Sequence, residues 1–234
     1  MWMIAAAALL QAGIVAQSVR GQELAAGKLL VASRDLLDPN FAQSVVLLVR
    51  YDDDSVVGLI VNRRTQIPLA RVFPELKEAK GQSDPIYRGG PVERTAALAL
   101  LRARTKPEDA EHVFANVSMI SSRALLDKTI AERMDPSMFH VYLGYSGWTK
   151  RQLQGEVELG AWHIFPGTAA AIFDPDPETL WTRLIRKTEE RIALAAEGVI
   201  YTNANHSSFV NRHYTARPRA ERQKERSTAR AEKS

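Results

Sequence analysis

One serine of the chain has a sequence context close to that of a catalytic nucleophile. Ser146 is the middle residue of Gly-Tyr-Ser-Gly-Trp. A nucleophile elbow needs G-x-S-x-G, because the turn that exposes the serine has no room for a large fifth side chain. Here Trp148 takes that position, and Lys150 is one residue too distant for an S-x-x-K pair. His140 and His163 are available as bases, but no acid can be assigned to orient them, so we predict no catalytic residue.

The same segment is explained more simply as the start of a helix. Thr149 and Gln152 have the spacing of a capping box, in which each side chain binds the backbone of the other residue. Trp148 and Leu153 have the spacing of a hydrophobic staple around that cap. Gly160 stands where a left-handed residue would end the helix. The sequence therefore predicts a helix that begins at Thr149 and ends near Gly160.

The remaining motif residues of this stretch are interpreted as structural too. Gly144 and Gly147 would let the chain turn tightly from a strand into the helix. Leu153 and Val157 lie at positions i and i+4, on the buried face of the helix. The residues that we assign to this structural group are Gly144, Tyr145, Trp148, Gln152, Glu156 and Trp162.

Two further motifs suggest ion binding, and neither has the required pattern. Gly89 and Gly90 would present backbone amides to a phosphate, but they lack the G-x-G-x-x-G and G-K-[ST] patterns, and Pro91 prevents the helix start that a phosphate loop needs. We predict a tight turn or a bulge there. The run Asp52–Asp54 has no EF-hand spacing and predicts a solvated turn. The five histidines form no H-x-x-x-H pair, so we expect no metal site and no cofactor.

The best place for a ligand pocket is the end of the apolar run "GLIVNRR". Asn62, Arg63 and Arg64 follow a buried strand, and polar groups at such a strand end can line a crevice. Arg63 is suited to an acidic group or another anion. The alternative is that the strand simply meets water there. The residues that we predict for the pocket are Asn62, Arg63, Tyr87, Gly89 and Gly90.

Apolar patterning and turn residues predict alternating strands and helices. The expected strands cover residues 27–33, 44–50, 56–62, 95–101, 112–119, 138–143, 162–165 and 169–173. The expected helices cover residues 67–76, 124–133, 149–160 and 177–196, the last with Asp176 as its N-cap. Residues 44–62 read as a hairpin that is apolar on both faces. This order predicts a single layered α/β domain, in which α and β elements are mixed (α+β). We expect a mixed β-sheet flanked by helices.

Length and composition fit one sizeable globular domain. The chain has 234 residues, of which 45% are hydrophobic and 25% charged. It has no cysteine, which excludes disulfides, thiolate metal sites and cysteine nucleophiles. We place the domain at residues 27–202, preceded by a linker at 19–26.

The two ends differ from this body. Residues 1–18 carry no charged side chain, and small residues at 16 and 18 suit signal peptidase. A cleaved signal would make the protein exported or periplasmic; a mere N-terminal extension leaves it cytoplasmic. Residues 203–234 carry eight Lys or Arg and three Asp or Glu, a net charge of +5. This tail is predicted to be disordered and able to contact polyanions, whereas residues 1–202 sum to −1 and are not expected to bind nucleic acid.

Four motifs, in this order and spacing, resemble the bacterial AlgH/YqgE family. They are "GKLLVASRDLLDPNFAQSVVLLV", "GLIVNR", "YRGGPV" and "LGYSGWTKRQLQGEVELGAW", and the resemblance covers about residues 27–196. It implies a single compact domain of mixed α and β structure. It carries no agreed catalytic residues, and one branch is described as a regulator of transcription and exopolysaccharide production. The chain departs from the family pattern at Arg64, where proline is usual, and at Arg151, where glycine is frequent.

These observations predict a non-enzymatic regulatory or binding module. The expected partner is a protein or a small molecule bound near Asn62–Arg63 and Tyr87–Gly90. No membrane span is expected in the mature body. The alternative is an enzyme that acts on an anionic substrate, and it requires Arg63, Tyr87, Tyr145 and Glu156 to converge in one cleft.

Overall fold

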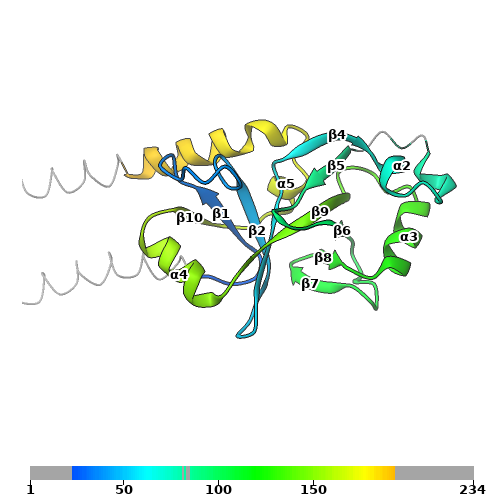
Figure 1. Ribbon diagram of the computed structural model, residues 1–234, viewed down its shortest axis with the longest axis horizontal. Coiled ribbons are helices and arrows are strands. Elements are labelled where there is room, and N and C mark those ends of the chain that lie inside the picture. Colours follow the sequence, from blue (N-terminus) through cyan, green and yellow to red (C-terminus); the bar gives the residue numbers. More distant parts are fainter. Residues whose placement is uncertain (1–22, 81, 83–84, 193–234) are drawn as a thin grey trace, which may run out of the picture. The chain divides into compact units, whose positions relative to one another are not determined.

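Ten strands form one curled sheet in the computed structural model, which describes residues 23–80, 82 and 85–192 (Figure 1). The chain divides into two units, residues 1–187 and 188–234, and the elements below belong to the first. The predicted signal peptide, residues 19–22 of the predicted linker, the end of the last predicted helix and the predicted basic tail lie outside the described residues. The strands are β1 (Lys28–Ala32), β2 (Val45–Tyr51), β3 (Val56–Ile60), β4 (Arg64–Pro68), β5 (Pro85–Arg88), β6 (Val92–Arg102), β7 (Glu111–Phe114), β8 (Val117–Ile120), β9 (Phe139–Trp148) and β10 (Trp162–Pro166).

The helices are short and lie between the strands. They are α2 (Leu69–Val72), the 3-10 turn η1 (Lys77–Ala79), α3 (Arg123–Ala131), α4 (Lys150–Glu158) and α5 (Ala169–Ile172). Residues 177–187 are also helical, and the Trp181 indole donates a hydrogen bond of 2.8 Å to the Ala32 carbonyl at the end of β1. Helix α4 packs beside β9 and β10, whereas α3 packs against η1.

The sheet is mixed, as the sequence predicts. Its order is β10-β1-β2-β3-β9-β6-β8-β7, and every pair along this path is antiparallel. Strand β5 pairs with β9 in the parallel direction and with β4 in the antiparallel direction. Strand β9 is therefore central, because β3, β5 and β6 all pair with it.

The sheet curls until its two ends approach each other. Phe114, on the last strand β7, lies against Gly27 beside β1, where an added Cβ would be 2.7 Å from the Phe114 Cβ. The Gly167 amide after β10 donates to the Gly27 carbonyl at 2.8 Å. Arg50 on β2 also reaches Glu111 on β7 at 2.5 Å. Strands β2 and β3 are consequently covered on both faces, as their uninterrupted apolar sequences predict.

Two predicted strands are wrong in their extent. The predicted strand over 138–143 runs on to Trp148 as β9, so the chain does not turn at Gly144 and Gly147 but only at Thr149. Pairing with β3 at residues 146–148 holds this extension in place. The predicted strand over 112–119 is the hairpin β7–β8, which turns at Ala115 with a φ of 44°. Periodicity does not reveal either event, because strand-like apolar residues stand on both sides of Ala115-Asn116 and of Gly144.

Two predictions of element type are also wrong. The segment predicted as a strand at 169–173 is the one-turn helix α5, whose Thr168 hydroxyl accepts a hydrogen bond from the Ala171 amide. The segment predicted as a helix at 67–76 begins inside β4, and only α2 within it is α-helical. The Thr65 hydroxyl binds the Ile86 carbonyl of β5 at 2.6 Å. Pairing between strands that are distant in sequence thus overrides the local helical pattern.

Candidate functional site

Two glycine motifs of the sequence meet at one point of close backbone contact. A Cβ on Gly89 would lie 2.2 Å from the Gly144 oxygen, and one on Gly90 would lie 2.1 Å from the Tyr145 carbonyl carbon. The Gly89 amide donates to Leu143 at 2.9 Å, and its carbonyl accepts from Ile60 at 2.8 Å. The glycine pair therefore lets the chain between β5 and β6 lie directly on β9.

Besides this close contact with Gly89, a bulge in β6 also requires a glycine at position 144. Val92 pairs with Tyr145 and Ala97 pairs with Leu143, so residues 93–96 oppose Gly144 alone. Gly144 has a φ of +71°, and an added Cβ would lie 3.2 Å from the Arg94 Cα. Within the bulge Glu93 has a φ of 41°, a left-handed conformation that is costly for a residue with a Cβ. The bulge carries Arg94 out of the regular strand.

The Asn62 side chain binds the backbone just before and at the start of β2. Its side-chain oxygen accepts from the Val45 amide at 2.7 Å, and its amide donates to the Gln43 carbonyl at 3.0 Å. The side chain is buried. Asn62 thus fixes the loop between β1 and β2, with one hydrogen bond through each of its two polar atoms. The prediction that it contacts a ligand gains no support from this geometry.

Arg63, the next residue, extends the same anchoring toward a cavity. Its guanidinium donates to the carbonyls of Asn40 at 2.7 Å and Ala42 at 3.0 Å. Burial lowers the pKa of Arg63, the positive charge of Arg88 lowers it further, and Asp38 opposes both. Arginine remains charged at neutral pH, so a half-buried cation stands beside a second cation.

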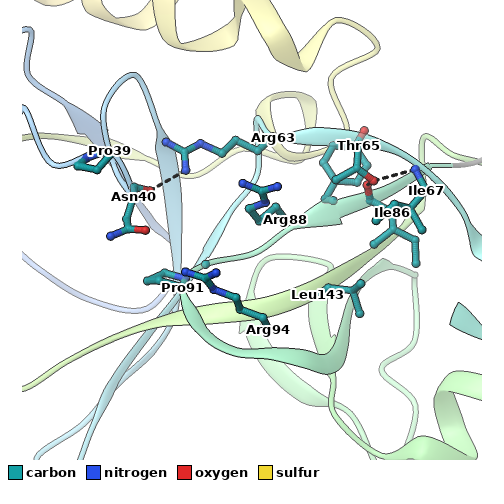
Figure 2. A pocket seen from close by; sticks show the side chains of 12 residues that line it. Pro39, Asn40, Arg63, Thr65, Ile67, Ile86, Arg88, Pro91, Arg94 and Leu143 are labelled. Atoms are coloured by element: carbon teal, nitrogen blue, oxygen red, sulfur yellow. Dashed lines mark hydrogen bonds between the residues drawn. The ribbon is translucent and has the colours of Figure 1, made fainter.

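Three guanidinium groups face the cavity of about 300 Å³ that Arg63 borders. They belong to Arg63 after β3, Arg88 on β5 and Arg94 in the β6 bulge (Figure 2). No carboxylate is among the residues that line the cavity. Within the described part of the chain, neither Arg88 nor Arg94 forms an ion pair through its guanidinium. The cavity therefore concentrates positive charge without a carboxylate in its lining.

The cavity also has an apolar wall. Figure 2 shows Ile67, Ile86 and Leu143 on the side away from Pro39 and Asn40. Of the predicted pocket residues, Arg63, Tyr87 and Gly90 line this cavity, whereas Asn62 borders only the adjoining hollow and Gly89 lines neither. The sequence interpretation missed Arg88 and Arg94. Arg88 precedes the glycine pair and was detectable there, but only the bulge brings Arg94 to the site.

Tyr87 belongs mainly to the core beneath the cavity. Its ring stacks on His140 with a centroid distance of 4.4 Å, and its hydroxyl lies 3.5 Å from His140 Nε2. Burial lowers the pKa of His140 to about 4, partly opposed by the Ile172 and Pro136 carbonyls. Burial also raises the pKa of the neighbouring Tyr142 well above its ordinary value. Both groups are consequently neutral at pH 7.

The residues assigned to the structural group have structural contacts. Thr149 and Gln152 form the predicted capping box, and Gly160 ends the turn after α4 with a φ of +77°. Glu156 Oε2 accepts from the indoles of Trp148 at 3.2 Å and Trp162 at 2.7 Å. These contacts support the interpretation that the aromatic residues of the motif hold the fold.

Ser146, the candidate nucleophile, and its neighbour Tyr145 have other contacts. Ser146 is fully buried, and its hydroxyl donates to the Gly89 carbonyl at 3.4 Å. Tyr145 donates to Glu93 at 3.3 Å and borders a second hollow of about 580 Å³. A serine so buried cannot act as an exposed nucleophile.

The four residues that an enzymatic site would bring together are separated. Arg63 and Tyr87 line the basic cavity, Tyr145 lines the second hollow, and Glu156 binds the two tryptophans. In the described residues no three His, Asp or Glu side chains cluster as metal ligands would. None of the helices in that part of the chain is long and apolar enough to cross a membrane.

Comparison with known proteins agrees with the sequence motifs. The family model described as AlgH-like (DUF179) matches residues 29–193. A UPF0301 protein of Mycobacterium ulcerans is 31% identical over 189 residues, which cover 79% of this chain and 92% of that protein. A UPF0301 protein of Mycobacteroides abscessus is 32% identical over 187 residues, covering 78% and 88%.

Two solved structures have folds similar to that of this chain. The solution structure of the AlgH protein from Pseudomonas aeruginosa has a TM-score of 0.55 at 31% identity, covering 73% of this chain and 86% of that chain. The crystal structure of protein DIP2367 from Corynebacterium diphtheriae has a TM-score of 0.59 at 22% identity, covering 70% and 87%, and it supports the fold. The family match, the relatives and these folds agree: the chain belongs to the AlgH-like family.

Proposed function

We propose that this protein is a non-enzymatic binding module whose ligand presents an anionic group to Arg63, Arg88 and Arg94. One observation carries the proposal: three guanidinium groups from three segments face one cavity that no carboxylate lines. Like charges held together repel; Arg63 is half-buried, whereas Arg88 and Arg94 are exposed, so water screens part of this repulsion. A bound anion would relieve this repulsion, and arginine is the side chain best suited to bind carboxylate or phosphate.

The backbone around the cavity supports a binding role. Glu93 holds a left-handed φ of 41° in the bulge that brings Arg94 to the site. Strained backbone of this kind persists only where the surrounding structure enforces it, and it is concentrated at functional sites. Besides the arginines and apolar side chains, the cavity lining contains the polar residues Asn40, Thr65 and Tyr87, but it contains no imidazole, carboxylate or thiol. Such a lining suits recognition of a charged group better than general acid–base chemistry.

The regulatory part of the proposal concerns what the bound ligand would control. The family resemblance suggests a regulator of transcription or exopolysaccharide production, and we propose that ligand occupancy alters an interaction with a protein partner. Direct contact with nucleic acid or another polyanion would involve the basic tail rather than the body. N-terminal sequencing of the protein from its native cell would decide its location, because a start near Val19 indicates export and a start at Met1 a cytoplasmic protein.

Titration by two-dimensional amide NMR would test the binding proposal. Inorganic phosphate added to the full chain should shift the amides of Arg88, Gly90 and Arg94, and chloride at equal ionic strength should not. The variant Arg88→Gln/Arg94→Gln should lose these shifts. Arg102→Gln, an exposed arginine at the other end of β6, should keep them. Shifts that persist in the double variant would refute the site.

A further inference from the structure

We infer that the ligand of the basic cavity is a small phosphomonoester: a dianionic head with three free oxygens, joined to a short apolar arm. This inference rests on the proposed function and specifies its ligand class. It depends on two features of the cavity, which are the number and placement of the cations and the apolar wall opposite them.

The number of cations exceeds what one carboxylate can neutralise. Arg63, Arg88 and Arg94 bring three charges to the cavity, and its lining contains no acid. A carboxylate brings one negative charge, whereas a phosphomonoester carries about −1.5 to −2 at pH 7. Asp38 is not part of the lining, and its effect on the pKa of Arg63 is smaller than the effects of burial and of Arg88. A dianion therefore balances the site better than a monoanion does.

The placement of the cations favours a tetrahedral head. Arg63 follows β3, Arg88 lies on β5 and Arg94 lies in the β6 bulge, so the three guanidinium groups approach from three segments of the chain (Figure 2). A carboxylate is planar and is well served by one bidentate arginine. A phosphate ester has three terminal oxygens that point in different directions, and each can accept from a separate guanidinium. The carbonyls of Asn40 and Ala42 fix the Arg63 guanidinium in advance.

The apolar wall accounts for the rest of the ligand. Ile67, Ile86 and Leu143 line the same cavity as the arginines, and Figure 2 shows them on the side of the arginines away from Pro39 and Asn40. Ile86 is fully buried, so the part of this wall that meets water belongs to the half-buried Ile67 and Leu143. A free inorganic anion would leave that part against water, whereas an apolar arm would cover it. The volume of about 300 Å³ is at the lower limit of ligand sites, so the arm must be short.

Isothermal titration calorimetry on the full chain at pH 7.5 would test the inference with four probes. They are butyl phosphate (a dianion), methyl butyl phosphate (a monoanion with the same arm), pentanoate and inorganic phosphate. We expect butyl phosphate to bind about tenfold more tightly than either monoanion, a difference typical of an added charge-assisted contact. We also expect it to bind more tightly than inorganic phosphate, by about fourfold for each methylene that becomes buried.

The outcomes separate the inference from the proposed function. If pentanoate or methyl butyl phosphate binds as tightly as butyl phosphate, the dianionic head is wrong although the anion site stands. If inorganic phosphate equals butyl phosphate, the apolar arm is wrong. If none of the four probes binds, both the inference and the proposed function fail.

Two variants locate the binding. Arg94→Gln should lower the affinity for butyl phosphate by about tenfold, whereas Arg102→Gln should leave this affinity unchanged. Ile67→Ala, a half-buried position, should reduce the advantage of butyl phosphate over inorganic phosphate without changing the affinity for inorganic phosphate. Equal loss of both ligands in Ile67→Ala would contradict the assignment of the arm to this wall.

Discussion

Glu156 shows how a motif residue that resembles a catalytic acid can have a structural role. A single carboxylate oxygen accepts from two indoles, those of Trp148 at the end of β9 and Trp162 at the start of β10. Both tryptophans are buried, and the two rings lie 6.3 Å apart. Glu156 thereby ties α4 to the strands on either side of it.

Replacement of Glu156 tests this role. Glu156→Ala leaves two indole N–H groups without a partner, so we expect a loss of about 2–3 kcal/mol in the free energy of unfolding. Glu156→Gln keeps an acceptor and should cost about 1 kcal/mol. Urea unfolding measures both, and Glu158→Ala, an exposed neighbour on α4, should change stability by less than about 0.5 kcal/mol. Equal stability of Glu156→Ala and Glu158→Ala would contradict the clamp.

His140 predicts a pH dependence of stability. Its pKa is lowered to about 4 in the folded protein, against an ordinary value of 6.5 in the unfolded chain. Above pH 6.5 the imidazole is neutral in both states and the stability is complete. As the pH falls from 6.5 to 4, His140 becomes protonated in the unfolded chain but stays neutral in the folded protein, so the free energy of unfolding decreases. The expected loss from this group between pH 7 and pH 5 is about 2 kcal/mol.

Urea unfolding of variants at pH 7 and pH 5 isolates the His140 contribution. His140→Gln should lack about 2 kcal/mol of the decrease that the natural protein shows, because glutamine does not titrate. His112→Gln, at an exposed position, should retain the full decrease. An unchanged decrease in His140→Gln would show that other groups cause it.

At the scale of elements, the main feature that builds the basic cavity is the β5–β6 connection, which crosses directly over β9. Gly89 and Gly90 permit the crossing itself, and Gly144 accommodates both the crossing and the bulge that carries Arg94. The same glycines therefore connect the motifs "YRGGPV" and "LGYSGW" to the basic cavity. Their role is to admit close backbone contact. Gly89 directly follows Arg88, and Gly144 directly follows Leu143, and both of these neighbours line the cavity.

Two glycine substitutions are expected to have opposite effects on the stability of the folded protein. Gly90→Ala places a Cβ 2.1 Å from a backbone carbon of β9, which side-chain motion cannot relieve, and should cost about 3 kcal/mol or more. Gly155→Ala, inside α4 with no atom within 4 Å of the added Cβ, should stabilise the protein by up to about 1 kcal/mol. Thermal unfolding compares them, and a tolerated Gly90→Ala would disprove the crossing.

Local rules predicted those elements that local forces decide. The hairpin of β2 and β3, the capping box at Thr149 and the helix start after Asp176 all depend on near neighbours in sequence. The rules failed where distant strands decide the outcome. Strand β4 exists because β5 pairs with it, and β9 continues past Gly144 because β3 and Val92 pair with it.

The candidate site divides in the same way. Arg63 was predictable because it ends a buried strand, and Arg88 was detectable because it precedes the glycine pair. Arg94 was not predictable, since it comes from a bulge whose four residues oppose Gly144 alone. The sequence also could not show that the Asn62 side chain forms hydrogen bonds with the backbone of Val45 and Gln43.

At the scale of the molecule, the basic cavity contrasts with the charge of the body around it. Residues 1–202 sum to a net charge of −1, yet three cations face one small cavity without an acid in its lining. Elsewhere in the described chain, surface arginines such as Arg50, Arg123 and Arg183 form ion pairs with carboxylates. Such a local excess lowers stability unless something binds to it, which is a cost typical of functional sites.

The stability of the Arg88→Gln/Arg94→Gln variant, measured by thermal unfolding with and without butyl phosphate, tests this account most directly. Without the ligand, the variant should be as stable as the natural protein or slightly more stable, because two repelling cations have been removed. With the ligand in excess, only the natural protein should gain stability, as expected when a ligand binds the folded state alone. A variant that is clearly less stable without ligand, and gains as much from it as the natural protein does, would show that the arginines serve the fold and not a ligand.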